Sequence, residues 1–194
     1  YLACNMSDKI AAIASVTGAM GSFTQLNCNP THPTPVMEIH GTADFTVPFN
    51  DIVNGIEYWR NYNNCDLIAD TASVPDVILS DFSTAEHIVY NNGDNGVTTE
   101  LFKINNGGHT WPGSSISTGV TNYDINASVE IWKFFSRYDI NGLINDPVIV
   151  SNHNINKKLC SIIDLLGREV KRKKETLLFY IYDDGTVEKR MLIE

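Results

Sequence analysis

The chain has 194 residues, of which 43% are hydrophobic and 19% charged, and its formal net charge is −9 at pH 7. This size and composition suit one ordinary globular domain with a small appendage. The acidic balance argues against a nucleic-acid-binding surface, and no apolar run is long enough to cross a membrane.

Charge and composition change along the chain. Residues 1–141 carry a net charge of −10, whereas residues 142–194 carry +1. Asn and Asp recur up to residue 156, which is typical of a linker. We therefore predict a first domain over 1–141, a linker over 142–156 and a small module over 157–194. Because the first eight residues resemble the end of a helix, we expect this domain to be truncated at its N-terminus.

The first half of the domain is expected to contain two strands and a helix. A continuous apolar run over 10–16 is typical of a strand buried on both faces. A polar loop with prolines over 27–35 leads to a second short strand over 36–40. Apolar residues at helical spacing then predict an amphipathic helix over 51–62.

The second half continues with a hairpin and another helix. Residues 65–83 are polar and show no period. Strands are expected over 86–90 and 98–104, joined by turn-forming residues into a hairpin. That turn lacks the glutamate of a calcium loop, so we expect no metal site. Asp124 can cap a last helix that reaches Tyr138.

Two loops after strands carry side chains suited to proton transfer. The motif Gly-Gly-His-Thr-Trp-Pro-Gly at 107–113 places His109 on a loop that neither helix nor strand can absorb. Asp44 ends His-Gly-Thr-Ala-Asp, which follows the strand over 36–40. In α/β sheets, catalytic groups collect beyond the carboxyl ends of strands. Taken alone, a loop histidine can equally be a surface residue that makes hydrogen bonds.

The pairing of these motifs suggests a catalytic triad. An aspartate followed later by a histidine matches the chain order Ser, Asp, His of α/β hydrolases. In that chemistry the histidine takes the proton of the nucleophile, while the carboxylate fixes the histidine tautomer.

Residues 1 to about 138 resemble the C-terminal half of the secreted polyhydroxybutyrate depolymerase and feruloyl-esterase-like α/β hydrolases. The resemblance rests on Tyr-Leu-Ala-Cys at 1–4, Ile-Ala-Ser-Val at 13–16, Cys-Asn-Pro at 28–30, Val-Pro at 47–48 and the two motifs above. It implies a partial α/β-hydrolase fold, with Asp44 as triad acid and His109 as triad base. His40 is then structural and braces the turn of Asp44. Trp111 either walls the substrate pocket or packs the loop.

The chain contains no serine that matches the nucleophile of this family. Serines in this family lie in a Gly-x-Ser-x-Gly turn, which would precede Tyr1, and neither Ser15 nor Ser22 has such neighbours. Both oxyanion-hole donors would also be absent. We therefore expect the chain alone to have no esterase activity.

The tail resembles a second family. Leu-Leu-Gly-Arg-Glu at 165–169 and Asp-Asp-Gly-Thr-Val-Glu-Lys-Arg at 183–190 are similar to the C-terminal sorting domain of type IX secretion in Bacteroidetes-type bacteria. Two strand-like runs over 177–182 and 187–193 flank an Asp-Gly turn, which is a strong hairpin signal. The resemblance implies export to the cell surface or the medium by the type IX machinery. A plain β appendage is the alternative.

Cysteine spacing adds one further expectation. The four cysteines show no CxxC pair, which argues against structural zinc. Cys4 and Cys28 are the disulfide that we expect first, although spacing alone leaves the connectivity open.

The predicted function is a secreted carboxylic ester hydrolase that needs no cofactor and acts on a polymeric or smaller ester. A peptidase of the same fold is one alternative. A non-catalytic binding or adhesion module on the hydrolase scaffold is the other, because fold does not determine function.

Overall fold

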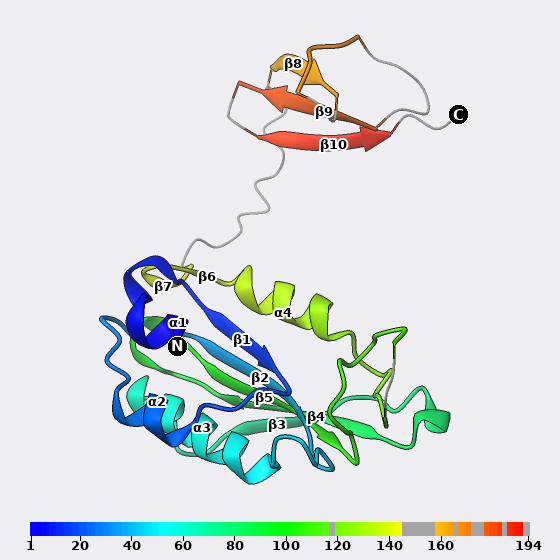
Figure 1. Ribbon diagram of the computed structural model, residues 1–194. Coiled ribbons are helices and arrows are strands. Elements are labelled where there is room, and N and C mark those ends of the chain that lie inside the picture. The colour runs from blue at the N-terminus through cyan, green and yellow to red at the C-terminus, as the bar shows by residue number, and fades with distance from the viewer. Residues whose placement is uncertain (117–118, 145–157, 165–166, 172–176, 184–185, 192–194) are drawn as a thin grey trace. The chain divides into compact units, whose positions relative to one another are not determined.

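The computed structural model divides into two compact units, Tyr1–Asn145 and Asp146–Glu194. It describes residues 1–116, 119–144, 158–164, 167–171, 177–183 and 186–191. Each unit has its own sheet (Figure 1). Of the predicted linker, Gly142–Leu143 form strand β7, which pairs with β6 (Tyr138–Asp139) in the first unit. Residues 145–157 lie outside the described part of the chain.

A mixed five-stranded sheet forms the centre of the first unit. Its strands lie in the order β1 (Ile13–Val16), β2 (Val36–Gly41), β5 (Thr99–Asn105), β4 (Thr84–Tyr90) and β3 (Asp70–Ser73). β1, β2 and β5 are parallel, whereas β4 and β3 are antiparallel to their neighbours. Unit 1 is therefore of mixed α/β class, and the expected hairpin of β4 with β5 is present.

Helices cover both faces of this sheet (Figure 1). α3 (Phe49–Tyr62) packs on β2 and β5 from one side, together with the short α2 (Ser22–Leu26). α4 (Ala127–Phe135) packs on β1 and β2 from the other. α1 (Leu2–Asn5) precedes β1 and gives way to a short 3-10 helix, Ser7–Lys9. None of the helices in the described ranges has the length and apolar character that a membrane span requires.

The packing of β2 explains why it is the central strand of the site. All of its six residues are buried, because it has a strand on either side and a helix on either face. Met37 and Ile39 point toward the cluster that contains Phe134 of α4. Since side chains alternate along a strand, Glu38 and His40 face α3.

Several expectations for single elements need correction. β1 is half-buried, because it is an edge strand with one partner, whereas we expected burial on both faces. The short α2 and the fully exposed β3 were not predicted from the sequence. Asn126, not Asp124, caps α4, since its side chain accepts a hydrogen bond from the Val129 amide. The Asp124 carboxylate instead accepts hydrogen bonds from the amides of Val77 and Ile78.

The second unit contains an antiparallel three-stranded sheet in the order β10-β9-β8. β9 (Leu177–Tyr182) pairs with β10 (Val187–Met191), where the sequence predicted a hairpin, and β8 (Leu159–Ile163) adds the third strand. Leu178, Tyr180 and Tyr182 form its small core. Asp184 and Gly185 of the predicted turn and residues 165–166 of the Leu-Leu-Gly-Arg-Glu motif lie outside the described residues, as do 172–174 of the basic run.

Candidate functional site

The loop after β2 holds Asp44 in a buried position. The Asp44 side chain is 0% exposed. Its Oδ1 accepts hydrogen bonds from the backbone amides of Thr46, at 2.8 Å, and Val47, at 2.9 Å. Burial alone would raise the pKa of this carboxyl group, but the hydrogen bonds from Val47, His109 and Thr46 outweigh burial and lower it. Asp44 is thus fixed as a carboxylate whose second oxygen, Oδ2, is available for another donor.

The loop after β5 brings His109 to this carboxylate. Gly41 and Gly107 let the two loops touch, because a Cβ atom at Gly41 would lie 2.2 Å from the Gly107 carbonyl oxygen. The same carbonyl accepts a hydrogen bond from the Ala43 amide at 2.9 Å. Glycine is therefore required where the two motifs cross, and His109 follows two residues later.

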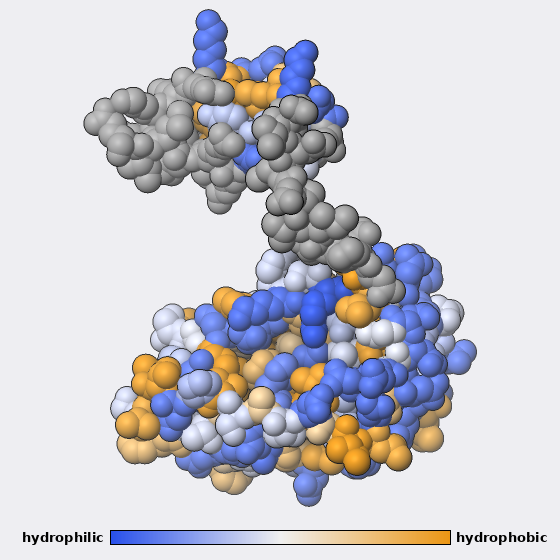
Figure 2. Space-filling view, turned by 180° about the vertical axis from the view of Figure 1, so that it is seen from behind, coloured by the Kyte–Doolittle hydropathy of each residue, from blue (hydrophilic) through white to orange (hydrophobic). Residues whose placement is uncertain are grey.

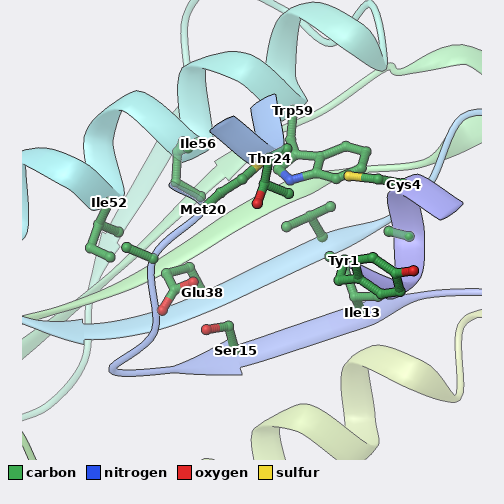
Figure 3. Close-up of a pocket in the computed structure, with 14 residues that line it drawn as sticks. Tyr1, Cys4, Ile13, Ser15, Met20, Thr24, Glu38, Ile52, Ile56 and Trp59 are labelled. Atoms are coloured by element: carbon green, nitrogen blue, oxygen red, sulfur yellow. The ribbon is translucent and has the colours of Figure 1, made fainter. Parts of the chain in front are cut away.

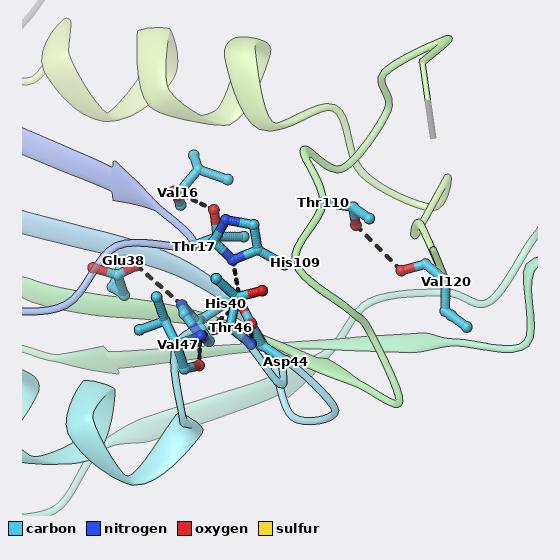
Figure 4. Close-up of polar contacts among 10 residues, drawn as sticks. All are labelled: Val16, Thr17, Glu38, His40, Asp44, Thr46, Val47, His109, Thr110 and Val120. Carbon is cyan, nitrogen blue, oxygen red and sulfur yellow. Dashed lines mark hydrogen bonds and ion pairs between the residues drawn. The ribbon is translucent and has the colours of Figure 1, made fainter. Parts of the chain in front are cut away.

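Asp44 and His109 form a hydrogen-bonded pair. The distance between His109 Nδ1 and Asp44 Oδ2 is 2.8 Å (Figure 4). A buried carboxylate can only accept, so Nδ1 donates, and a neutral imidazole then carries its lone pair on Nε2. The His109 side chain is 43% exposed, while Asp44 is covered. A half-exposed imidazole whose tautomer is fixed by a buried carboxylate can take a proton from a group outside the loop.

His40 lies behind this pair. Its side chain is 0% exposed, and its Nε2 lies 3.0 Å from the Val47 carbonyl oxygen and 3.3 Å from Asp44 Oδ2. Both neighbours are acceptors, so we assign the proton to Nε2. His40 therefore connects the two ends of the Asp44 turn. Two histidines share the Oδ2 atom of one carboxylate, at 2.8 and 3.3 Å (Figure 4).

Glu38 is the member of the site that sequence reasoning missed. It is 8% exposed, and its Oε1 lies 3.6 Å from His40 Nδ1. Burial raises the pKa of Glu38 to about 7, although interactions with His40 and Ser15 lower it in part. The available signal was a charged residue inside the apolar run Val36-Met37-Glu38-Ile39, two positions before His40.

A cavity of about 220 Å³ lies on the α3 face of the sheet, beside Glu38. Most of its lining is apolar and includes Ile56 and Trp59 of α3, with Ser15 and Glu38 among the polar groups (Figure 3). Neither Asp44 nor His109 lines it. The Asp44–His109 pair and the largely apolar cavity are therefore separate features, and Glu38 and His40 lie between them.

Trp111 lies two residues after His109 and is 45% exposed. Its indole Nε1 donates a hydrogen bond to the Ser128 hydroxyl of α4 at 3.2 Å. This bond fixes the loop to the helix, yet nearly half of the Trp111 surface remains accessible. Phe45, which follows Asp44, is 98% exposed. Aromatic surface thus directly follows Asp44 and also lies two residues beyond His109.

The structure also describes the four cysteines and the two serines that the sequence singled out. Cys4 and Cys28 form a disulfide, which fixes α1 to the segment after α2. Cys65 is buried and Cys160 exposed, both as free thiols. Within the ranges that the structure describes, no three His, Cys, Asp or Glu side chains are grouped as a metal site. Ser15 lies beside Glu38 in the cavity, and Ser22 begins the exposed α2.

Figure 2 shows a face of the first unit where hydrophilic side chains are interspersed with exposed apolar ones. No protein-family model matches the chain, and no curated protein matches it either.

Proposed function

We propose that Asp44 and His109 are the acid and base of a serine carboxylic ester hydrolase. The observation that carries this proposal is the 2.8 Å contact between His109 Nδ1 and the buried Asp44 carboxylate. These residues follow β2 and β5, which are adjacent and parallel, so both lie beyond the carboxyl ends of their strands. Convergent loops at that edge of a sheet are the usual position of catalytic groups in α/β proteins.

The chemistry assigns each residue a step. His109 Nε2 takes the proton of a serine hydroxyl as the serine attacks the ester carbonyl carbon. The imidazolium, stabilised by Asp44, then donates this proton to the departing alcohol. For deacylation His109 activates a water molecule in the same way, and the serine regains its proton. No cofactor takes part in these steps.

The proposal also includes a position for the nucleophilic serine. Ser15 and Ser22 lack the glycine-flanked turn that exposes such a nucleophile, and Ser15 interacts with Glu38. We therefore place the serine and its oxyanion hole in sequence that precedes Tyr1, on a partial α/β-hydrolase fold whose described part includes β1, β2 and β5. Among the described residues β1 pairs with β2 alone, and this edge position and the parallel direction of the three strands support this placement.

Export by the type IX machinery is the second part of the proposal. It is supported by the sequence of the tail and by its division from the first unit. Deleting residues 157–194 should retain the protein inside cells that possess the machinery, whereas fusing them to a reporter should export it. Equal export with and without this tail would contradict the proposal.

The test of catalysis uses the complete reading frame that contains this sequence. We expect hydrolysis of p-nitrophenyl butyrate or methyl ferulate, with kcat reduced about 10³-fold or more by His109→Ala and by about 10²- to 10⁴-fold by Asp44→Asn. Glu86→Gln, a change on the same sheet away from the pair, should leave kcat unchanged. Faster turnover of peptides than of esters would favour a peptidase. Polymer binding without turnover would favour a binding module.

A further inference from the structure

The buried atoms behind Asp44 include two that lack a hydrogen-bond partner. Among the described residues, Glu38 Oε1 and His40 Nδ1 are buried without a partner, and they face each other at 3.6 Å. His40 Nε2 carries the proton toward Val47 and Asp44, so the neutral ring presents a lone pair to Glu38. A carboxylate oxygen and a nitrogen lone pair are both acceptors and repel each other, whereas a proton on either one makes the contact attractive.

We propose that Glu38 and His40 are positioning residues for the acid–base pair, sharing one buried proton whose loss tightens the hydrogen bond between Asp44 and His109. The shared proton lies either on Glu38, facing His40 Nδ1, or on His40, where it forms an imidazolium beside the Glu38 carboxylate. In both forms the two side chains carry no net charge. Loss of the proton leaves them with one negative charge.

The consequence for His109 follows from the two donors on Asp44 Oδ2. His40 Nε2 lies 3.3 Å from this oxygen and His109 Nδ1 lies 2.8 Å from it. Once the shared proton leaves, His40 becomes a weaker donor, because a neutral ring donates less strongly than an imidazolium or a ring polarised by a carboxylic acid. Asp44 then accepts more fully from His109. The added negative charge acts in the same direction.

The pKa values support this arrangement. Burial raises the pKa of Glu38 to about 7. Burial works against a charged His40, but Glu38, the Val47 carbonyl and Asp44 together outweigh it, so the pKa of His40 lies above its usual value. Both shifts favour keeping one proton on the pair up to about pH 7.

Other charged groups near this pair already have partners or are exposed. On the same sheet face, Lys103 and Glu86 pair with each other at 3.0 Å. α3 packs on this face, and its Asp51 and Glu57 are exposed, while Arg60 lies over the Tyr90 ring. Ser15 on β1 contributes a hydroxyl to Glu38. The groups in contact with the shared proton are therefore Glu38 and His40 themselves, with Asp44 and His109 next.

Nuclear magnetic resonance on the 194-residue chain tests the proposal without substrate. The Glu38 side-chain carbonyl carbon should titrate near pH 7, and the ring nitrogens of His40 should follow with the same midpoint. At pH 9, long-range proton–nitrogen spectra should show a larger Nδ1–H tautomer fraction for His109 in the wild type than in Glu38→Gln. The matched control Glu86→Gln should leave the His109 tautomer at its wild-type value.

Three results would overturn the proposal. One is titration of Glu38 near its ordinary range, which the wild-type chain alone reveals even if Glu38→Gln fails to fold. Another is a His40 ring whose shifts ignore the Glu38 midpoint. The third is an equal His109 tautomer fraction in the wild type and Glu38→Gln. The relevance to catalysis rests on the proposed function, but absent ester turnover would leave these ring shifts unaffected, so the two proposals can fail separately.

Discussion

Glu38 on β2 and Glu100 on β5 are buried carboxylates on neighbouring strands of one sheet, and their pKa values are shifted in opposite directions. They lie on opposite faces, since Glu38 faces α3 and Glu100 faces α4. Burial raises the pKa of Glu38 to about 7. Burial acts on Glu100 as well, but hydrogen bonds from His87 and Thr98 and the charge of Arg137 outweigh it.

The difference comes from the number of donors that each carboxylate receives. Glu100 accepts from His87 Nε2 at 2.9 Å, from the Thr98 hydroxyl at 2.6 Å and from Arg137. Glu38 has one oxygen without a partner. A buried carboxylate with several donors is held in its charged form and stabilises the fold, whereas one with too few remains able to bind a proton. We infer a structural role for Glu100 and a proton-holding role for Glu38.

The largest effect is expected on the Glu100 side. Arg137→Met should lower the free energy of unfolding by about 3 kcal/mol, because it leaves a buried carboxylate short of its cation. Lys133→Met in α4, four residues before Arg137, removes the more exposed pair with Glu130 and should cost less than about 1 kcal/mol. Urea denaturation at pH 7 measures both. Equal costs would show that burial does not distinguish these pairs.

Replacing glutamate by glutamine should change the free energy of unfolding in opposite directions at Glu38 and at Glu100. The folded-state pKa of Glu38 is raised, so its contribution to stability is complete below about pH 4.5 and is lost as pH rises through about 7. This loss amounts to about 3 kcal/mol. At pH 8, Glu38→Gln should therefore stabilise the fold by about 1–2 kcal/mol and flatten its pH dependence, whereas Glu100→Gln should destabilise it. A lower stability for Glu38→Gln at pH 8 would contradict this account.

A smaller effect is expected at Asp44, in acid. Its pKa is lowered in the fold, so its contribution is present above the unfolded value of about 3.8 and is lost as pH falls through the folded value. Asp44→Asn should thus make unfolding less sensitive to pH below about 4. The amide oxygen can still accept from Thr46 and Val47. Acid titrations followed by circular dichroism compare the two proteins, and parallel curves would rule out a lowered pKa at Asp44.

Sequence patterns predicted the elements that have strong periodicity or a continuous apolar run. The amphipathic helix up to Tyr62, the buried strand from Val36 and the hairpin of β4 with β5 fall in this class. Polar edge elements were missed, because β3 is four exposed residues with a neighbour on one side only, and such a segment shows no hydrophobic pattern. The cap of α4 was misplaced by two residues, since Asp124 and Asn126 are both good capping residues.

The sequence predicted the site residues that belong to recognisable motifs. It did not predict the residue whose properties depend on how the strands and helices pack. The sequence predicted the pairing of Asp44 with His109, because each belongs to a glycine-containing motif after a strand. Glu38 was not, because its environment depends on the register of β1, β2 and β5 and on the side chains of α3, none of which the sequence alone supplies. Likewise, the shared use of Asp44 Oδ2 by His40 and His109 is a property of three-dimensional geometry.

The most direct test of the proposed acid–base pair is fluorophosphonate labelling of the complete reading frame, with the modified peptide identified by mass spectrometry. We expect one serine in a Gly-x-Ser-x-Gly sequence before Tyr1 to be labelled, and we expect His109→Ala to slow this labelling at least 10²-fold because the hydroxyl loses its base. Labelling that is absent, or that proceeds at the same rate in His109→Ala, would contradict the assignment of Asp44 and His109 to ester hydrolysis.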